Sequence, residues 1–158
     1  MDICIHFLLA KALQKVNLVS KSKLSPYGVT PVQYALLRQL WRQDGQFGSI
    51  LGDRLQLDSA TITGIIDRLE QNGFIERRAD PNDRRNKLVY LTEKGRSLEL
   101  PLCEKMDAMN QEVMSDFDDD EIQRFKEMLF EIGIRKKSQE ETIFRRFICE
   151  SENEGHYG

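Results

Sequence analysis

The stretch that most constrains the fold is residues 74–92, where two short runs with strand character flank a polar segment rich in arginine. This segment contains Asp80-Pro81-Asn82-Asp83, whose residue types favour a turn, and Pro81 suits the second position of a type I turn. A helical pattern lies directly upstream and ends at Asn72-Gly73, where glycine suits the left-handed position after a helix. The sequence therefore predicts a helix followed at once by a basic β-hairpin.

The helix upstream of the hairpin, residues 59–72, has two unlike faces. Asp58 or Ser59 can cap its first turn. One face carries four apolar residues spaced i, i+3, i+4 and i+7, namely Ile62, Ile65, Ile66 and Leu69. The opposite face carries Ala60, Thr63, Gly64, Asp67, Arg68 and Gln71, which are short up to Arg68. Short side chains let a helix backbone approach base edges, and hydroxyls in the first turn can donate to phosphates.

A helix followed by a basic hairpin is typical of the winged helix, in which the helix enters the DNA major groove and the hairpin tip reaches the backbone or the minor groove. The net charge of −3 by itself gives no support for a nucleic-acid partner. Between Arg77 and Lys87, however, five cations and two anions give a local charge of +3. A basic patch on an acidic chain favours binding to DNA in one orientation.

Helices are predicted on both sides of the hairpin, so the fold class is mainly α with a small β-hairpin wing. Capping boxes are expected at Thr30 with Gln33 and at Asp118 with Glu121, while Thr92 can cap a further helix. Phe47 is expected in a minimal strand, and Ser49 is expected to cap the helix after it. The expected helices span residues 2–24, 31–43, 50–55, 59–72, 92–115, 118–134 and 138–150.

Three of these helices carry apolar faces that need a partner. The helix over 92–115 has a seam at steps of three and four residues, suited to packing against another helix. Pro101 should kink this helix or mark a late start. The seam can serve an internal core or a dimer, and a dimer is favoured because the long helices exceed what a small winged-helix core can cover. The faces are Leu98, Leu102, Met106, Met109 and Val113; Phe7, Leu8, Ala12, Leu13, Val16 and Val19; and Ile122, Phe125, Met128, Leu129 and Ile132.

Composition argues against several other classes of protein. No apolar stretch approaches the ~18 residues of a membrane span, and the N-terminus resembles an amphipathic helix more than a signal peptide. Cys4, Cys103 and Cys149 form no CxxC motif, which excludes a zinc finger and does not favour a disulfide framework. Reduced thiols and a cytoplasmic location are therefore expected.

Catalytic, metal and cofactor sites are not expected. The chain has no nucleophile–base pair and no glycine-rich phosphate loop, so it is predicted not to be an enzyme and to need no cofactor. His6 and His156 are its two histidines, which does not favour metal binding.

The order of these elements resembles the MarR (multiple antibiotic resistance regulator) family over roughly residues 5–134. The resemblance rests on the run from Asp58 to Gly73, on the Asp80–Arg85 hairpin and on the Leu91-Thr92-x-x-Gly95 pattern. It implies a winged helix-turn-helix homodimer joined through its long terminal helices. It divides the chain into a dimerisation helix (1–29), a DNA-binding domain (30–92), dimerisation helices (93–150) and a disordered tail (151–158).

The resemblance also assigns DNA contacts to particular residues. In the major groove it places Ser59, Ala60, Thr61, Thr63 and Arg68. At the wing tip it places Arg85 in the minor groove, oriented by Asp83, with phosphate contacts from Arg84 and Lys87. Arg77 and Arg78 lie on alternate faces of a strand, so at most one of them points at DNA.

Two mechanisms for sensing a signal remain open from the sequence. His6, Tyr34 and Arg38 are candidates to line a pocket for a small aromatic or phenolic acid, as the resemblance implies. Alternatively, Tyr34 is a core residue and Arg38 is solvated. The peroxide-sensing branch of the family has a reactive cysteine just before an apolar run in the first helix. Here His6 holds that position, and Cys4 lies two residues earlier, about 200° around the helix.

The sequence thus predicts a repressor that binds a pseudo-palindromic operator on double-stranded DNA and leaves it when a small effector binds. Half-site centres should lie about 10 bp apart. The alternatives are an oxidant-sensing repressor that uses a thiol and a winged-helix module that binds proteins and has no operator.

Overall fold

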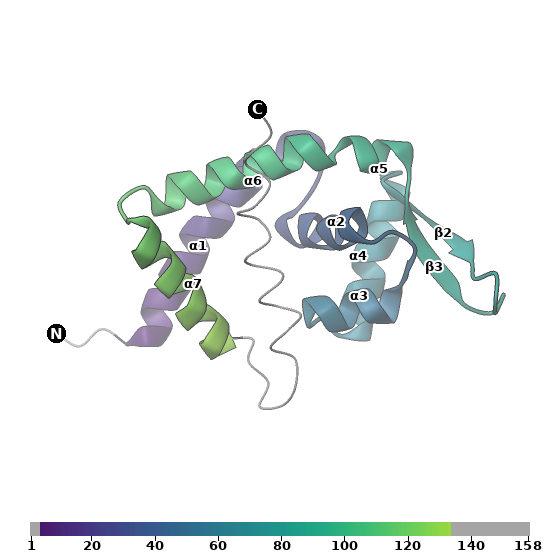
Figure 1. The fold of residues 1–158 in the computed structure, drawn as a ribbon, viewed down its shortest axis with the longest axis horizontal. Coiled ribbons are helices and arrows are strands. Elements are labelled where there is room, and N and C mark those ends of the chain that lie inside the picture. The colour runs from purple at the N-terminus through teal and green to yellow at the C-terminus, as the bar shows by residue number, and fades with distance from the viewer. Residues whose placement is uncertain (1–3, 134–158) are drawn as a thin grey trace. The chain divides into compact units, whose positions relative to one another are not determined.

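The computed structural model describes residues 4–133, and within them it contains eight helices and three strands (Figure 1). The fold class is the expected one, mainly α with a β-hairpin wing. The helices are α1 (Ile5–Leu24), the 3-10 helix η1 (Ser25–Tyr27), α2 (Pro31–Arg42), α3 (Gly48–Leu55), α4 (Ser59–Gln71), α5 (Glu93–Ser97), α6 (Glu99–Met114) and α7 (Asp119–Gly133). The strands are β1 (Gln46–Phe47), β2 (Ile75–Ala79) and β3 (Lys87–Leu91).

The chain forms two compact units, Met1–Val113 and Met114–Gly158. The helix expected at 138–150 and the tail at 151–158 lie outside the described residues. The four-part division expected from the sequence stays a prediction.

The three strands form one antiparallel sheet in the order β1-β3-β2. Phe47 lies in the minimal strand expected there and pairs with Leu88. The position of the turn in the hairpin was predicted wrongly. The backbone hydrogen bond that closes the turn runs from Asn86 N to Asp83 O (2.9 Å), whereas the Asp80 side chain accepts a bond from Asn82 N (2.9 Å). An Asx-type bond thus replaces the type I turn expected at 80–83, because the aspartate side chain competes for the backbone donor.

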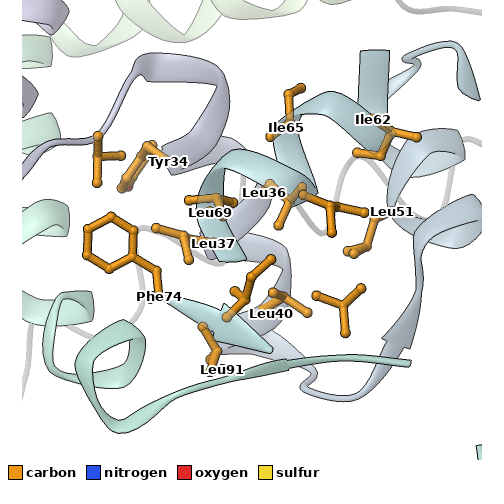
Figure 2. Packing of buried hydrophobic residues seen from close by; sticks show 14 of the residues in the cluster. Tyr34, Leu36, Leu37, Leu40, Leu51, Ile62, Ile65, Leu69, Phe74 and Leu91 are labelled. Atoms are coloured by element: carbon orange, nitrogen blue, oxygen red, sulfur yellow. The ribbon is translucent and has the colours of Figure 1, made fainter. Parts of the chain in front are cut away.

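One hydrophobic core lies among α2, α3, α4 and the sheet (Figure 2). The apolar stripe of α4 is buried as the sequence predicted, with Ile62, Ile65, Ile66 and Leu69 at most 6% exposed. Leu36, Leu37 and Leu40 of α2 face this stripe and are fully buried. Burying large aliphatic side chains contributes about 2 kcal/mol each, so the packing fixes α4 firmly on α2.

Helix caps follow the local sequence patterns closely. Thr30 and Gln33 exchange the two bonds of a capping box, and Asp58 and Thr92 cap α4 and α5. The cap expected from Ser49 is wrong, because α3 begins at Gly48 with Phe47 as its N-cap residue. Since β1 ends at Phe47, the chain passes directly from strand to helix and leaves no linker for Ser49 to cap.

The single helix expected over 92–115 is divided into α5 and α6 at Leu98. Pro101 explains the break, because it has no N–H to donate to residue 97 and its ring would clash with that carbonyl in a continuous helix. Leu102 and Met109 are buried, and Leu98 and Met106 pack against the core. Leu98, Leu102 and Met106 of the seam therefore serve the internal core, and a role of the seam in a dimer stays a prediction.

α1 leaves most of its apolar face uncovered within the described unit. Its buried residues are Val19, Ser20 and Leu24, near its C-terminal end. Its exposed large apolar residues are Ile5, Phe7, Leu8, Leu13 and Leu18, each 47–67% accessible. None of the helices within residues 4–133 combines the length and hydropathy needed to cross a bilayer.

The second unit contributes one described helix, α7. Its capping box is formed as expected, with Asp118 N bonded to Glu121 Oε2 (3.1 Å) and Glu121 N to Asp118 Oδ1 (2.8 Å). The buried face expected on this helix is not observed, since no residue of α7 is buried. Phe125, Met128, Leu129 and Ile132 are all exposed, because a single amphipathic helix cannot cover its own apolar stripe.

Candidate nucleic-acid interface

The first turn of α4 is fixed by Asp58. Its Oδ1 accepts a hydrogen bond from Thr61 N (2.9 Å), and its Oδ2 accepts one from the Thr61 hydroxyl (2.6 Å). The side-chain bond from Thr61, followed by the backbone bond from the same residue, lowers the pKa of Asp58 below its ordinary value of 3.8. Asp58 is therefore an ionised cap at neutral pH, and the Thr61 hydroxyl proton is used within the helix.

The exposed face of α4 presents small and hydroxyl side chains. Ser59, Ala60, Thr61, Thr63 and Arg68, the residues predicted to enter the major groove, are all exposed. The Thr63 hydroxyl donates to Ser59 O (2.7 Å), so its proton is used within the helix. A Cβ atom added at Gly64 would meet nothing within 4 Å, so the fold itself does not require glycine there. The five predicted residues are thus brought onto one helix, and their contact with DNA stays a prediction.

The wing tip presents arginine in an orientation set by Asp83. Asp83 Oδ1 accepts bonds from Arg85 N (3.1 Å) and Arg85 Nε (3.3 Å). Asp83 Oδ2 accepts a bond from Asn86 Nδ2 (3.2 Å). The Arg85 side chain remains 92% exposed, and Arg84 and Lys87 are exposed beside it. The geometry therefore has the Asp83–Arg85 arrangement expected from the sequence.

Arg77 and Arg78 both pair with carboxylates of the protein. The Arg77 guanidinium pairs with Asp67 and Glu70 of α4. The Arg78 guanidinium pairs with Glu76 and lies 4.8 Å from the centre of the Tyr90 ring. The sequence predicted that these arginines lie on opposite faces of the strand, but it assigned Asp67 and Glu70 no part in holding the wing.

The C-terminal end of α4 is fastened to the start of α5. The Thr92 hydroxyl donates to Gly73 O (2.7 Å), Thr92 N donates to Phe74 O (3.1 Å), and Lys94 Nζ donates to Asn72 O (2.9 Å). Gly73 has a φ of 73°, as expected for a glycine after a helix. A Cβ atom at Gly95 would lie 2.0 Å from Phe74 O, so this close approach requires glycine.

A second polar cluster, away from the wing, joins α2 to α6. Arg38 Nη1 donates to the Tyr34 hydroxyl (3.2 Å), which donates to Cys103 Sγ (3.9 Å). Burial, partly offset by Arg38, raises the pKa of Tyr34 to about 12, and burial also raises the pKa of Cys103. The sequence predicted Tyr34 and Arg38 as candidates but did not assign Cys103, because 69 positions separate it from Tyr34.

His6, the third candidate for an effector site, does not lie on α2 with Tyr34 and Arg38 but on α1. It is exposed in the first turn of α1, about 20 Å along the helix axis from the first buried residue, Val19. Cys4, considered for thiol sensing, is exposed at the N-cap position of α1. Among residues 4–133, no three histidine, cysteine, aspartate or glutamate side chains come together to hold a metal ion.

A helix with one buried apolar face and one exposed face of small residues, followed by a basic β-hairpin wing, defines a winged helix-turn-helix protein of the DNA-binding class. The model of the MarR family matches residues 29–87. Over these residues, and more widely in its known relatives, the chain is similar to transcriptional regulators of the MarR family.

Known proteins similar to this chain include one curated regulator and two solved structures. The regulator MhqR of Bacillus subtilis (strain 168) is 29% identical over 133 residues, which are 84% of this chain and 92% of MhqR. A MarR mutant from E. coli, in complex with operator DNA, is 26% identical with a TM-score of 0.75 and covers 81% of this chain and 92% of its own. CouR from Rhodococcus jostii RHA1, bound to p-coumaroyl-CoA, is 29% identical with a TM-score of 0.74 and covers 85% of this chain and 95% of its own.

Proposed function

We propose that this protein is a homodimeric repressor that binds a pseudo-palindromic operator and is released by a small-molecule effector. The observation that carries the proposal is the wing tip, where Asp83 orients an arginine whose side chain is 92% exposed. An arginine held at the end of a hairpin suits a narrow A·T minor groove, where the negative potential is strongest. The similar E. coli protein solved with operator DNA supports the same use of this fold.

In this proposal α4 occupies the major groove. Its exposed face begins with Ser59, Ala60 and Thr61, continues through Thr63 and ends at Arg68. Because the first four side chains are short, the helix backbone can approach the base edges, while Arg68 is long enough to reach a guanine. Arg84 and Lys87 add phosphate contacts from the wing, which makes the affinity depend on salt.

The dimer in this proposal forms through the uncovered apolar faces of the terminal helices. α1 presents five apolar side chains that are 47–67% exposed, a pattern typical of an interaction surface. A two-fold dimer places two copies of α4 one helical turn of DNA apart, about 34 Å, which matches the two halves of a palindrome. We propose that the protein acts in the cytoplasm.

For the effector we propose an aromatic or phenolic acid bound near Tyr34 and Arg38. The guanidinium of Arg38 suits a carboxylate, and the Tyr34 hydroxyl, which burial keeps neutral, lies beside it. CouR is a similar protein whose structure holds p-coumaroyl-CoA, a thioester of a phenolic acid. Binding would change the separation of the two α4 helices and break their match to the groove.

The test is a fluorescence anisotropy titration of the protein against the duplex upstream of its own gene, at several salt concentrations. A scrambled duplex of the same length and base composition is the control. We expect tight binding to the upstream duplex, weaker binding to the scrambled one, and release by an aromatic carboxylate. Equal binding to both duplexes would contradict the operator. No salt-dependent binding to either would favour a module that binds proteins.

A further inference from the structure

Arg77 connects the two elements that the proposed function places on DNA. It belongs to β2 of the wing, and its guanidinium is forked between Asp67 and Glu70 of α4. Its backbone N–H also donates to Glu70 Oε1 (3.0 Å), so Glu70 accepts bonds from both the main chain and the side chain of one residue. Asp67 and Glu70 are three positions apart, which places both carboxylates on the same side of the helix.

The fork is more sheltered than the other ion pairs of the wing. The Arg77 side chain is 22% exposed, compared with 59% for Arg78 and 92% for Arg85. Burial acts to lower the pKa of Arg77, but the hydrogen bonds that its guanidinium donates to Asp67 and Glu70 outweigh burial and raise the pKa. Arg77 is therefore a permanent cation neutralised by two carboxylates, and it adds no positive charge for a phosphate to attract.

We propose that Arg77 is a positioning residue for DNA binding, whose fork to Asp67 and Glu70 sets the angle between the wing and α4. This inference rests on the proposed function. Arg77 contacts Asp67 and Glu70 within the protein and affects DNA binding only by placing Arg85. A planar guanidinium with two carboxylate partners holds an orientation that a single charge cannot hold.

Because Arg77 lies well before the wing tip, a small change in the angle between the hairpin and α4 displaces the tip by a large distance. Arg77 pairs with Val89 at the middle of the hairpin strands, whereas Arg85 lies in the connecting loop. The tip is roughly 12 Å further along the hairpin at ~3.3 Å per residue, so a tilt of about 10° would move it by about 2 Å. Such a shift exceeds the tolerance of a hydrogen bond, whose length varies by about half an ångström.

The experiment compares Arg77→Lys with a matched control, Arg78→Lys, one position along the same strand. Arg78 has its partners Glu76 and Tyr90 within the hairpin, so its replacement leaves the link to α4 intact. Affinity for the upstream duplex is measured against salt concentration, and urea unfolding is measured on the same samples. We expect Arg77→Lys to weaken binding by about tenfold with an unchanged salt slope. We expect little change in Arg78→Lys.

A double-mutant cycle with Arg85→Ala separates positioning from a loss of stability. If Arg77 acts by aiming Arg85, the penalty of Arg77→Lys should largely vanish once Arg85 is absent. Equal penalties in both backgrounds, or a salt slope lower by about one per subunit in Arg77→Lys, would overturn the inference, since the latter indicates a direct phosphate contact. Should Arg77→Lys not fold, Glu70→Gln removes one arm of the fork and is expected to show the same coupling.

The outcomes distinguish this inference from the proposed function beneath it. If the wild-type protein shows no salt-dependent binding, the proposed function fails and the role of Arg77 falls with it. If the wild type binds and Arg85→Ala weakens binding while Arg77→Lys does not, the role assigned to Arg77 alone is wrong.

Discussion

α4 and the wing tip are held in the protein by different means, although both are proposed to contact the same DNA. α4 is fixed along its whole length, by Asp58 at its start, by the buried stripe from Ile62 to Leu69, and by Thr92 beyond its end. The wing tip is exposed and is organised by the side-chain bonds of Asp83 to its neighbours. One element is positioned by packing and the other by local polar bonds.

This difference separates two kinds of mutational effect. Substitutions in the contacts that hold α4 in place should alter the free energy of unfolding, because they disturb buried contacts and close backbone approaches. Changes at the tip should alter DNA affinity and leave stability almost unchanged, because exposed pairs contribute little to folding.

The largest expected effect is that of Gly95→Ala on the free energy of unfolding, because Gly95 packs against the backbone just after α4. Its Cβ would lie 2.0 Å from Phe74 O, a backbone atom that cannot move without displacing the end of α4. We expect a loss of about 3 kcal/mol in the free energy of unfolding, at the upper end of overpacking effects. Urea unfolding measures this. An unchanged urea midpoint would show that α5 is not fastened to α4 as described.

Next in size is the effect of Arg85→Ala on the wing tip. We expect operator affinity to fall about tenfold and the salt slope to fall by about one per subunit, because a cation near phosphates is lost. The urea midpoint should stay within error of wild type, since the side chain is 92% exposed.

Asp83→Asn is the companion variant to Arg85→Ala. It keeps an acceptor for Arg85 but loses the charge that orients the guanidinium, so it should weaken binding less than Arg85→Ala. Unchanged operator affinity in Arg85→Ala would refute the wing assignment.

The elements that the sequence predicted well are those fixed by neighbours in the chain. The capping bonds of Thr30 with Gln33 and of Asp58 with Thr61 span three positions, so the residue types alone reveal them. The buried stripe of α4 follows from helical spacing, and the Asp83–Arg85 pair spans two positions. Local geometry leaves few alternatives at such short separations.

The features that the sequence missed depend on contacts between distant parts of the chain. The ion pairs of Arg77 with Asp67 and Glu70 join β2 to α4, and the Tyr34–Cys103 bond spans 69 positions. Residue types did not show which carboxylate would meet which arginine, because strand register and helix packing decide that. The assignment of the seam to the core, through Leu102, likewise depends on how α6 packs.

Gly64→Ala, on the exposed face of α4, is expected to have a smaller effect: a gain in stability together with a loss of operator affinity. The added methyl meets nothing within 4 Å, so alanine should raise the free energy of unfolding by about 0.5–1 kcal/mol through its higher helix propensity. If DNA approaches the helix closely there, operator affinity should fall several-fold in the same variant. Higher stability with undiminished affinity would show that Gly64 lies outside the contact surface.

The smallest expected effect is that of Asp58→Asn, and it depends on pH. The folded-state pKa of Asp58 is depressed by its bonds from Thr61, so its ionised form contributes stability above its unfolded pKa. That contribution is lost as the pH falls through the folded-state value, below 3.8. Asparagine can still accept the bond from Thr61 N but carries no charge at the helix N-terminus. The melting temperature of Asp58→Asn should therefore lie slightly below that of wild type at neutral pH, and the two should converge on acidification. If the difference in melting temperature between the two proteins stays constant down to pH values below the pKa of carboxylates, the charge of Asp58 does not stabilise the first turn of α4.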